Sequence, residues 1–275
     1  MIVKSLDASP FLLMAARRHP LNCPVSGTEQ GVIGLPGFPS MEAARRSARG
    51  CFGLGLVLIA ALVHFWGAGE ARTSIGETVF ITMIGGAWLL LITRLFPWLG
   101  LSARDDAVDR RNVSALVAVC GAVLATALAY GGGNIGEGPS YWNNIFSGGL
   151  GTCGLLGLWI ILELGARVSS SIAEERDLAS GVRLCGFLLA TGLICGRAVA
   201  GNWHSVADTV RDFVHDARPA AALCAVALVL ELFLRPGRST PIRSWALYGL
   251  LPALLYLSVA ALWLLHLGAW EGYPR

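Results

Sequence analysis

The chain has 275 residues, of which 55% are hydrophobic and only 14% are charged. Soluble domains carry roughly 25% charged residues, and several apolar runs here approach the roughly 20 residues that cross a bilayer. The composition therefore excludes an ordinary soluble protein and predicts an all-α, polytopic membrane bundle. The net charge of +3 is small, and its placement gives no reason to expect a nucleic-acid partner in addition to the lipid bilayer.

A tail of about 49 residues precedes the first apolar run. It is rich in Pro and Gly, lacks helical periodicity and contains no signal-peptide core, so we expect a disordered cytoplasmic segment. Met41 is also a plausible alternative start, in which case residues 1–40 are not translated. Seven predicted spans follow, at about 50–68, 78–97, 113–131, 145–165, 184–202, 219–234 and 245–268.

Basic residues gather on one side of this map. The tail and the connections after the second, fourth and sixth spans hold 16 of the 21 Lys and Arg residues. Cytoplasmic segments carry such an excess of positive charge, so we predict a cytoplasmic N-terminus and a periplasmic C-terminus. All but one of these residues are Arg, which is typical of a GC-rich bacterial genome and indicates a bacterial inner membrane.

One stretch of apolar sequence occurs nearly twice. CGAVLATAL at 120–128 and CGFLLATGL at 185–193 agree at six of nine positions, and each follows a charged turn that ends in Arg-Asn or Arg-Asp. We predict a duplicated two-helix hairpin over 77–204, with repeats at about 77–142 and 143–204 related by a pseudo-twofold axis along the membrane normal. The other parts are the tail 1–49, the first span with its outer loop (50–76), and an outer amphipathic helix plus two spans (205–275).

Small residues in the repeated helices predict close helix packing. Packing, rather than the hydrophobic effect, holds membrane helices together, and small residues four apart let two backbones approach. We expect both repeated glycines to face protein at equal depth and both repeated threonines to form hydrogen bonds. The predicted packing residues are Gly121, Thr126, Gly186, Thr191, Gly192 and Gly196.

The repeated pattern also resembles a known family. A charged turn, then Arg-[Asn/Asp] and an apolar helix with small residues, present twice in parallel hairpins, resembles the YjfL-like family of small bacterial inner-membrane proteins with four spans. The resemblance covers about 77–204 and implies a membrane module, without any catalytic residues to carry over. This chain departs from the family pattern in its tail, its first and last two spans, and its 65-residue period.

Four Arg and Glu residues fall inside predicted spans, where an unpaired charge costs roughly 2.5–3.5 kcal/mol. Arg94, Glu163 and Glu231 lie near the cytoplasmic ends of their spans at similar depth. They are predicted to pair with one another, to line a vestibule for a cation or proton, or to extend to the membrane interface, which is easier for the long Arg side chain than for Glu. Arg197 lies near the outer end of the fifth span, where it holds an anion, pairs with Glu137 or extends to the lipid headgroups.

The outer face combines glycine, asparagine and aromatic residues over 131–144, with Glu137 as its one charge. His64, His204 and His266 lie at one depth and are candidate ligands of a metal or haem, but no HxH or HxxxH pair fixes their geometry. The seven Cys residues include no CxxC, so we expect them to pack rather than to form disulfides. We therefore predict no metal and no cofactor.

The leading functional hypothesis is a non-enzymatic membrane module that assembles with itself or with other envelope proteins. Residues 205–217 are predicted to form an amphipathic helix capped by Ser205 and Asp208, which lies on the outer membrane surface or serves as a docking face for a periplasmic partner. No hydrolase, metalloprotease or phosphate-binding motif occurs in the sequence. The alternatives are a small-ion channel or transporter built on the intramembrane charges, and a redox component that binds haem or metal through the three histidines.

Overall fold

Helices make up nearly all of the chain that the structure describes, which is residues 40–235 and 244–268 of a computed structural model. In chain order they are α2 (Met41–Trp66), α3 (Gly69–Thr73), α4 (Ile75–Thr93), the 3-10 helix η1 (Phe96–Leu99), the π-helix η2 (Ala103–Asp109), α5 (Val113–Gly132), α6 (Tyr141–Ala166), α7 (Val168–Ala173), α8 (Leu178–Ala198), α9 (Val206–Asp216), α10 (Arg218–Leu234), the π-helix η3 (Ala246–Leu250) and α11 (Leu251–Leu267). The described residues contain no strand, only an isolated bridge between Gly67 and Ile135. The all-α prediction is confirmed.

Six of these helices are long and apolar enough to cross a membrane, and the pair α9 and α10, bent by 42°, brings the number to seven. The chain is therefore a polytopic helical membrane bundle, as predicted. Two helices begin well before the predicted spans, and residues 41–49, predicted to belong to a disordered tail, are helical. Helix α2 begins at Met41 rather than at 50, with Ser40 capping its first turn, and α8 begins at Leu178 rather than at 184. The rest of the predicted disordered tail, residues 1–39, lies outside the described residues.

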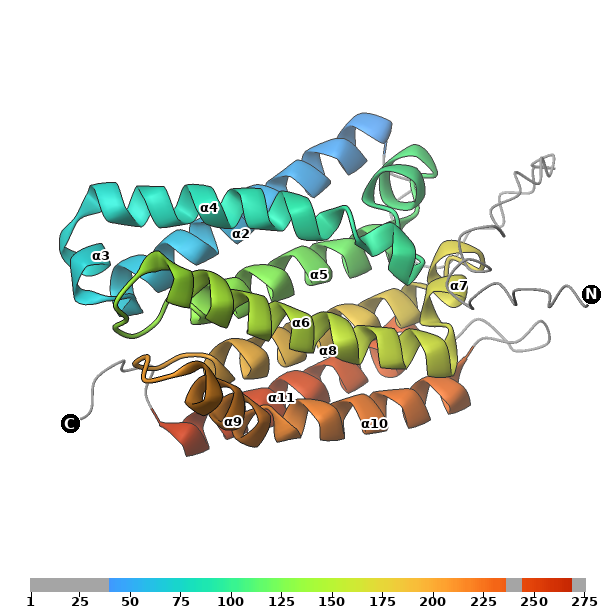
Figure 1. Cartoon of the computed structure of the whole chain (residues 1–275). Helices are drawn as coiled ribbons and strands as arrows, with labels where there is room; N and C mark the ends of the chain where they lie inside the picture. The colour runs from blue at the N-terminus through green and yellow to red at the C-terminus, as the bar shows by residue number, and fades with distance from the viewer. Residues whose placement is uncertain (1–39, 236–243, 269–275) are drawn as a thin grey trace, which may run out of the picture. The chain divides into compact units, whose positions relative to one another are not determined.

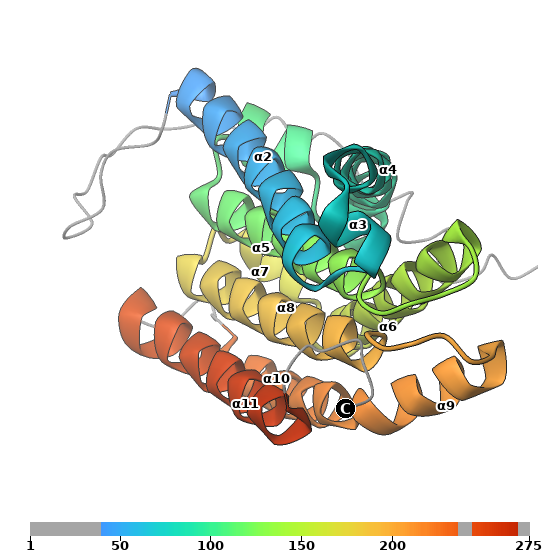
Figure 2. The same cartoon turned by 90° about the vertical axis from the view of Figure 1, so that its left-hand side faces the viewer.

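The spanning helices form two layers (Figures 1 and 2). Helices α2, α5, α8 and α11 lie side by side in one row, and α4, α6 and α10 lie along one side of that row. In the apolar windows of α5 and α8, 72% of the residues are buried, against 22% in α2 and in the η3–α11 segment. The two repeated helices are therefore the core, and the other helices leave apolar side chains for lipid.

The two copies of the repeated sequence have the same local structure. Arg111 and Arg176 both adopt a left-handed backbone conformation, with φ of 50° and 56°. Each is followed by an Asx residue whose side chain accepts a hydrogen bond from the backbone N–H three residues later, and this caps α5 or α8. Such side-chain caps satisfy donors that the first helical turn leaves free. The repeated lead-in is thus a device for starting a buried helix.

The repeated glycines both face protein, as predicted, but they face different neighbours. A methyl group on Gly121 would lie 2.6 Å from Sγ of Cys185 on α8, whereas one on Gly186 would collide with Ala253 on α11. A twofold axis between α5 and α8 would instead place Gly186 against α5. The predicted pseudo-twofold axis is therefore wrong, because each helix makes this contact with the next helix along the row.

On the opposite faces of α5 and α8, equivalent small residues also contact different neighbours in the row. Methyl groups on Gly192 and Gly196 would meet α5, at Ala125 and Leu128 respectively. Gly131, which is the sequence equivalent of Gly196, instead meets Leu62 of α2. The small-residue ladder is confirmed as a packing surface, and each copy contacts the preceding helix in the row.

The repeated threonines differ from each other. The Thr126 hydroxyl donates a 2.8 Å hydrogen bond to the Ala122 carbonyl, as predicted. The Thr191 hydroxyl is buried without a hydrogen-bond partner in the described part of the chain, so the prediction for Thr191 was wrong. The Thr191 side chain is fully buried.

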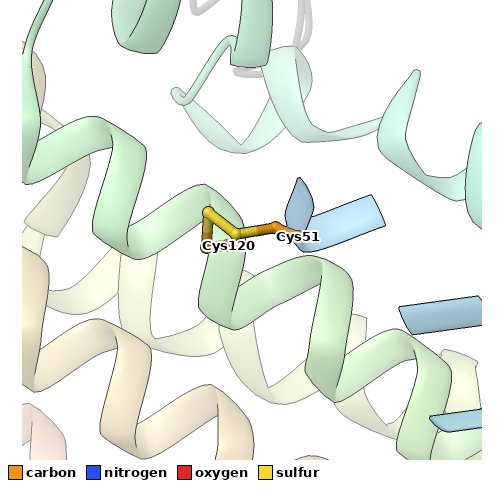
Figure 3. Close-up of a disulfide and its surroundings, with 2 residues drawn as sticks. All are labelled: Cys51 and Cys120. Carbon is orange, nitrogen blue, oxygen red and sulfur yellow. A yellow bond between two sulfur atoms is a disulfide. The ribbon is translucent and has the colours of Figure 1, made fainter. Parts of the chain in front are cut away.

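A disulfide joins Cys51 of α2 to Cys120 of α5 (Figure 3), with the two Cα atoms 5.5 Å apart. The prediction that every cysteine only packs was therefore wrong. Disulfides need Cα atoms within about 4.4–6.8 Å, and the close packing of α2 on α5 satisfies that condition across 69 residues of sequence. Among the described cysteines, Cys153, Cys185, Cys195 and Cys224 are free.

Candidate functional site

A buried ion pair joins α8 to α10 near the predicted cytoplasmic end. The guanidinium of Arg183 donates to both carboxylate oxygens of Glu231, from Nε at 2.6 Å and from Nη2 at 2.7 Å. It also donates to the backbone oxygen of Tyr248 at 2.7 Å and to the Ser180 hydroxyl at 2.9 Å. Arg183 is 1% exposed and Glu231 5%, so this bidentate pair lies within the bundle.

Local sequence explains how Arg183 is held. Ser180 and Arg183 are three residues apart on α8, so their side chains lie on the same face. The Ser180 hydroxyl donates onward to Asp177, the N-cap residue of α8, at 2.6 Å. A buried charge is tolerated when it is paired and its hydrogen-bonding capacity is used. Three helices and one capping residue therefore share this cluster.

Glu163 forms a second buried polar site, at the end of α6. Its carboxylate accepts a 2.9 Å hydrogen bond from the backbone N–H of Ser169 and a 2.5 Å bond from the Ser169 hydroxyl. Gly100, with φ of +85°, packs directly on Ser169, where a methyl group would collide. Glu163 is 3% exposed, and both of its carboxylate oxygens are thus held by the first turn of α7.

The predicted association of Arg94, Glu163 and Glu231 was wrong. Arg94 is exposed at the end of α4, and it pairs with no carboxylate in the part of the chain that the structure describes. Glu231 pairs with Arg183, which the sequence interpretation placed in a cytoplasmic connection because the fifth span was taken to begin at 184. The capping pattern Asp177-x-x-Ser180 is the signal that extends α8 far enough to include Arg183.

At the predicted outer end, Glu137 joins three segments. Its carboxylate accepts a 2.7 Å hydrogen bond from the Gly69 N–H, while its own N–H donates to the Asn202 side chain at 2.9 Å. Arg197 donates to the backbone oxygen of Leu267 at 3.2 Å. The predicted pairing of Arg197 with Glu137 is wrong, because Glu137 ties the loop after α5 to α3 and Arg197 ties α8 to α11.

A small polar hollow lies beside Glu137. It is partly open, and the residues that line it include several glycines together with Glu137, Asn143, Ser147 and Trp203. Asn143 is 5% exposed, and its Nδ2 has no hydrogen-bond partner in the ranges described. The glycine-rich segment 131–144 singled out from composition therefore forms one wall of an outer-face site.

The three candidate histidines lie on separate elements. His64 and His266 lie in the last turns of α2 and α11, and His204 precedes α9. Within residues 40–235 and 244–268, no three His, Cys, Asp or Glu side chains are placed to hold a metal ion. His64 instead contacts Phe65 edge-on, and His266 stacks on Trp263 at 5.2 Å.

Helix α9 is capped as predicted, with the Asp208 N–H donating to the Ser205 hydroxyl at 3.1 Å. Phe213 is half-buried, and a methyl group on Gly154 of α6 would lie 2.5 Å from its ring. Val214, on another face, is 62% exposed. One apolar side of α9 therefore packs on the bundle, and another is left for lipid.

These features define a multi-pass helical membrane protein whose buried charges are bound within the bundle. No family model matches the chain, and neither a curated protein nor a solved structure matches it. The resemblance to the YjfL-like family stays a prediction.

Proposed function

We propose that the protein is a non-enzymatic module of a bacterial inner membrane that associates with a second copy of itself through the outward face of α6. The name α6 face is used here for Gly149, Cys153, Gly157 and Ile161. These residues are spaced four apart and share one side of the helix. The proposed sidedness follows the positive-inside distribution of arginine.

The observation that carries the proposal is an unfilled notch at Gly157. Methyl groups added at Gly151, Gly154 or Gly165 of the same helix would meet atoms of α5, α9 or α10. No atom of the described chain lies within 4 Å of a methyl group added at Gly157. Cys153, four residues earlier, is exposed. The α6 face thus has a small-xxx-small pattern of the kind that membrane helices use to pack closely.

A glycine inside a helix lowers stability by about 1 kcal/mol relative to alanine. At Gly151, Gly154 and Gly165, close packing against neighbouring helices offsets this loss. Gly157 receives no such compensation within one copy. A helix from a second copy would supply it, since Ile161 is 53% exposed and Leu164 is 58% exposed beside the notch. The carboxylates of Glu163 and Glu231 already accept hydrogen bonds from Ser169 and Arg183. This supports a structural role for the intramembrane charges more than an ion path.

Cysteine cross-linking in native membranes tests the proposal. Cys23 is first replaced by Ser, so that Cys153 is the exposed thiol under study. Mild oxidation should then trap a dimer that disappears in Cys153→Ser. Gly157→Leu should reduce the cross-linked fraction at least fivefold, whereas Gly53→Leu should not, although Gly53 of α2 also has open space around it.

Two results would overturn self-association through α6. One is the absence of a cross-linked dimer at protein levels that saturate the assay. The other is an equal dimer fraction in Gly157→Leu and Gly53→Leu. Proton or cation flux through reconstituted protein that is lost in both Glu163→Gln and Glu231→Gln would instead support the transport alternative.

A further inference from the structure

Helix α8 is open to the membrane along a single stripe. Helices α4, α6 and α10 cover one side of the row, and no other spanning helix of the described chain covers the opposite side (Figure 2). All residues of α8 are buried except six, which are Leu178, Val182, Cys185, Leu189, Leu193 and Arg197. At 3.6 residues per turn these six fall within about 120° of the helix circumference. The stripe is therefore apolar up to its outer end, where it finishes in an arginine.

This stripe forms the floor of a groove. A methyl group on Gly192 would meet α5, and one on Gly186 would meet α11. The two glycines point about 120° apart around α8, and partly exposed Leu189 lies midway between them. Because that angle is well below 180°, α5 and α11 lie forward of α8 on this side and form the walls of the groove.

The repeated sequence in α5 extends the groove. Gly121 packs on α8, and Ala127 packs on Gly55 of α2. These two residues are again about 120° apart, with partly exposed Leu124 midway between them. Each repeated helix thus has its two neighbours in the row lying forward on the same side, so this side of the row is concave.

Arg197 has unused hydrogen-bond donors at the outer end of the stripe. A guanidinium carries five N–H groups, and in the described chain Arg197 donates only from Nη2, to the Leu267 oxygen at 3.2 Å. Its Nε is enclosed and unpaired, whereas Nη1 is not enclosed. No described carboxylate forms an ion pair with Arg197, since Asp216, which acts on it from a longer distance, pairs with His215 at 2.8 Å. The charge of Arg197 is therefore available to an anion.

Charge and length together select the anion. Arginine binds phosphate oxygens through its planar fork of N–H groups, and in the predicted topology Arg197 lies near the outer membrane interface. Below it, the apolar stripe from Leu193 to Leu178 is about 22 Å long at 1.5 Å per residue. One leaflet contributes about 15 Å, half of a hydrocarbon core of about 30 Å. The stripe is therefore long enough for an acyl chain that hangs from a bound phosphate.

We propose that the concave side of the row binds one phospholipid, with its phosphate on Arg197 and an acyl chain along the stripe of α8. The proposal does not rest on self-association through α6, because α6 lies on the other side of the row (Figure 2).

Native mass spectrometry of the full chain in a nonionic detergent tests the proposal. The probes are dioleoyl phosphatidylglycerol, dioleoylglycerol, which has the same acyl chains without the phosphate, and inorganic phosphate. We expect one phosphatidylglycerol to be retained per chain, and neither of the other probes to displace it at the same concentration. Arg197→Gln should weaken the binding of phosphatidylglycerol about tenfold, which corresponds to about 1.4 kcal/mol. Arg211→Gln is the matched control, since Arg211 is an outer-face arginine that pairs with Asp208 on α9, and it should bind like the wild type.

Leu189→Trp tests the groove separately from the charge, and it decides the question if Arg197→Gln does not fold. The indole would fill the floor between α5 and α11 and should also weaken binding about tenfold, about 1.4 kcal/mol. Leu91→Trp is its control, because Leu91 is 58% exposed on α4, outside the groove. The proposal is overturned if phosphatidylglycerol shows no saturable binding, if dioleoylglycerol or inorganic phosphate binds as tightly, or if both groove variants bind like their controls.

Discussion

Replacing Glu231 with Leu would leave the guanidinium of Arg183, a side chain only 1% exposed, without its carboxylate inside the bundle. Two of the hydrogen bonds that Arg183 donates end on Glu231, so the substitution removes both charge-assisted contacts while the positive charge stays buried. Removing one partner of a buried ion pair costs about 3–5 kcal/mol. We expect Glu231→Leu to lose that much free energy of unfolding.

The double variant Arg183→Met and Glu231→Leu should recover most of this loss, because replacing both members of a buried pair with apolar residues is often neutral. Unfolding by a denaturing detergent, followed by circular dichroism, measures the three free energies. Glu42→Leu is the control, since Glu42 and Arg46 pair with side chains 79% and 74% exposed, and it should change stability by no more than about 0.5 kcal/mol. Equal losses in the single and double variants would refute the reasoning.

Three further predictions concern packing, the disulfide and sidedness. Gly121→Leu should lower the free energy of unfolding by at least about 1–3 kcal/mol, because the side chain would overlap α8, whereas Gly53→Leu should change it little; equal effects would contradict the packing described for α5. Cys51→Ser should cost about 2–4 kcal/mol, and a reducing agent should destabilise the wild type but not the variant. A reporter that works only in the periplasm should be active after Arg275 and inactive within 104–111, and the reverse pattern would contradict the predicted topology.

Hydropathy and helical spacing were sufficient to predict the spanning helices, because bilayer thickness and apolar composition determine where a chain can cross. Hydropathy and helical spacing did not predict where α2 and α8 begin. Charged residues end a hydropathic run, but they do not end a helix, so α2 continues back through Arg45 and Arg49 to its cap at Ser40. Sequence capping patterns, such as Asp177-x-x-Ser180 for α8, mark these starts more reliably than hydropathy does.

The candidate polar residues were chosen by their predicted depth in the membrane. This choice identified buried carboxylates correctly, but it assigned them the wrong partners. Glu163 and Glu231 are buried near helix ends, where a carboxylate needs hydrogen-bond donors. Which donors they receive depends on the lateral order of the helices, and the sequence shows no direct sign of that order. Arg183 reaches Glu231 because α8 packs beside α10, whereas Arg94 lies at the exposed end of α4.

The order of the row also explains why the repeated letters are visible in two helices only. Helices α5 and α8 each have a neighbour on both sides, so Gly121 and Gly186 serve one side, while Gly131 and Gly196 serve the other. Both surfaces restrict the sequence to small residues in the same register. Helices α2 and α11 lie at the ends of the row and have one such neighbour each. Their other side faces lipid, where the sequence is not restricted to small residues. The repetition therefore marks the helices that are enclosed on both sides by the row.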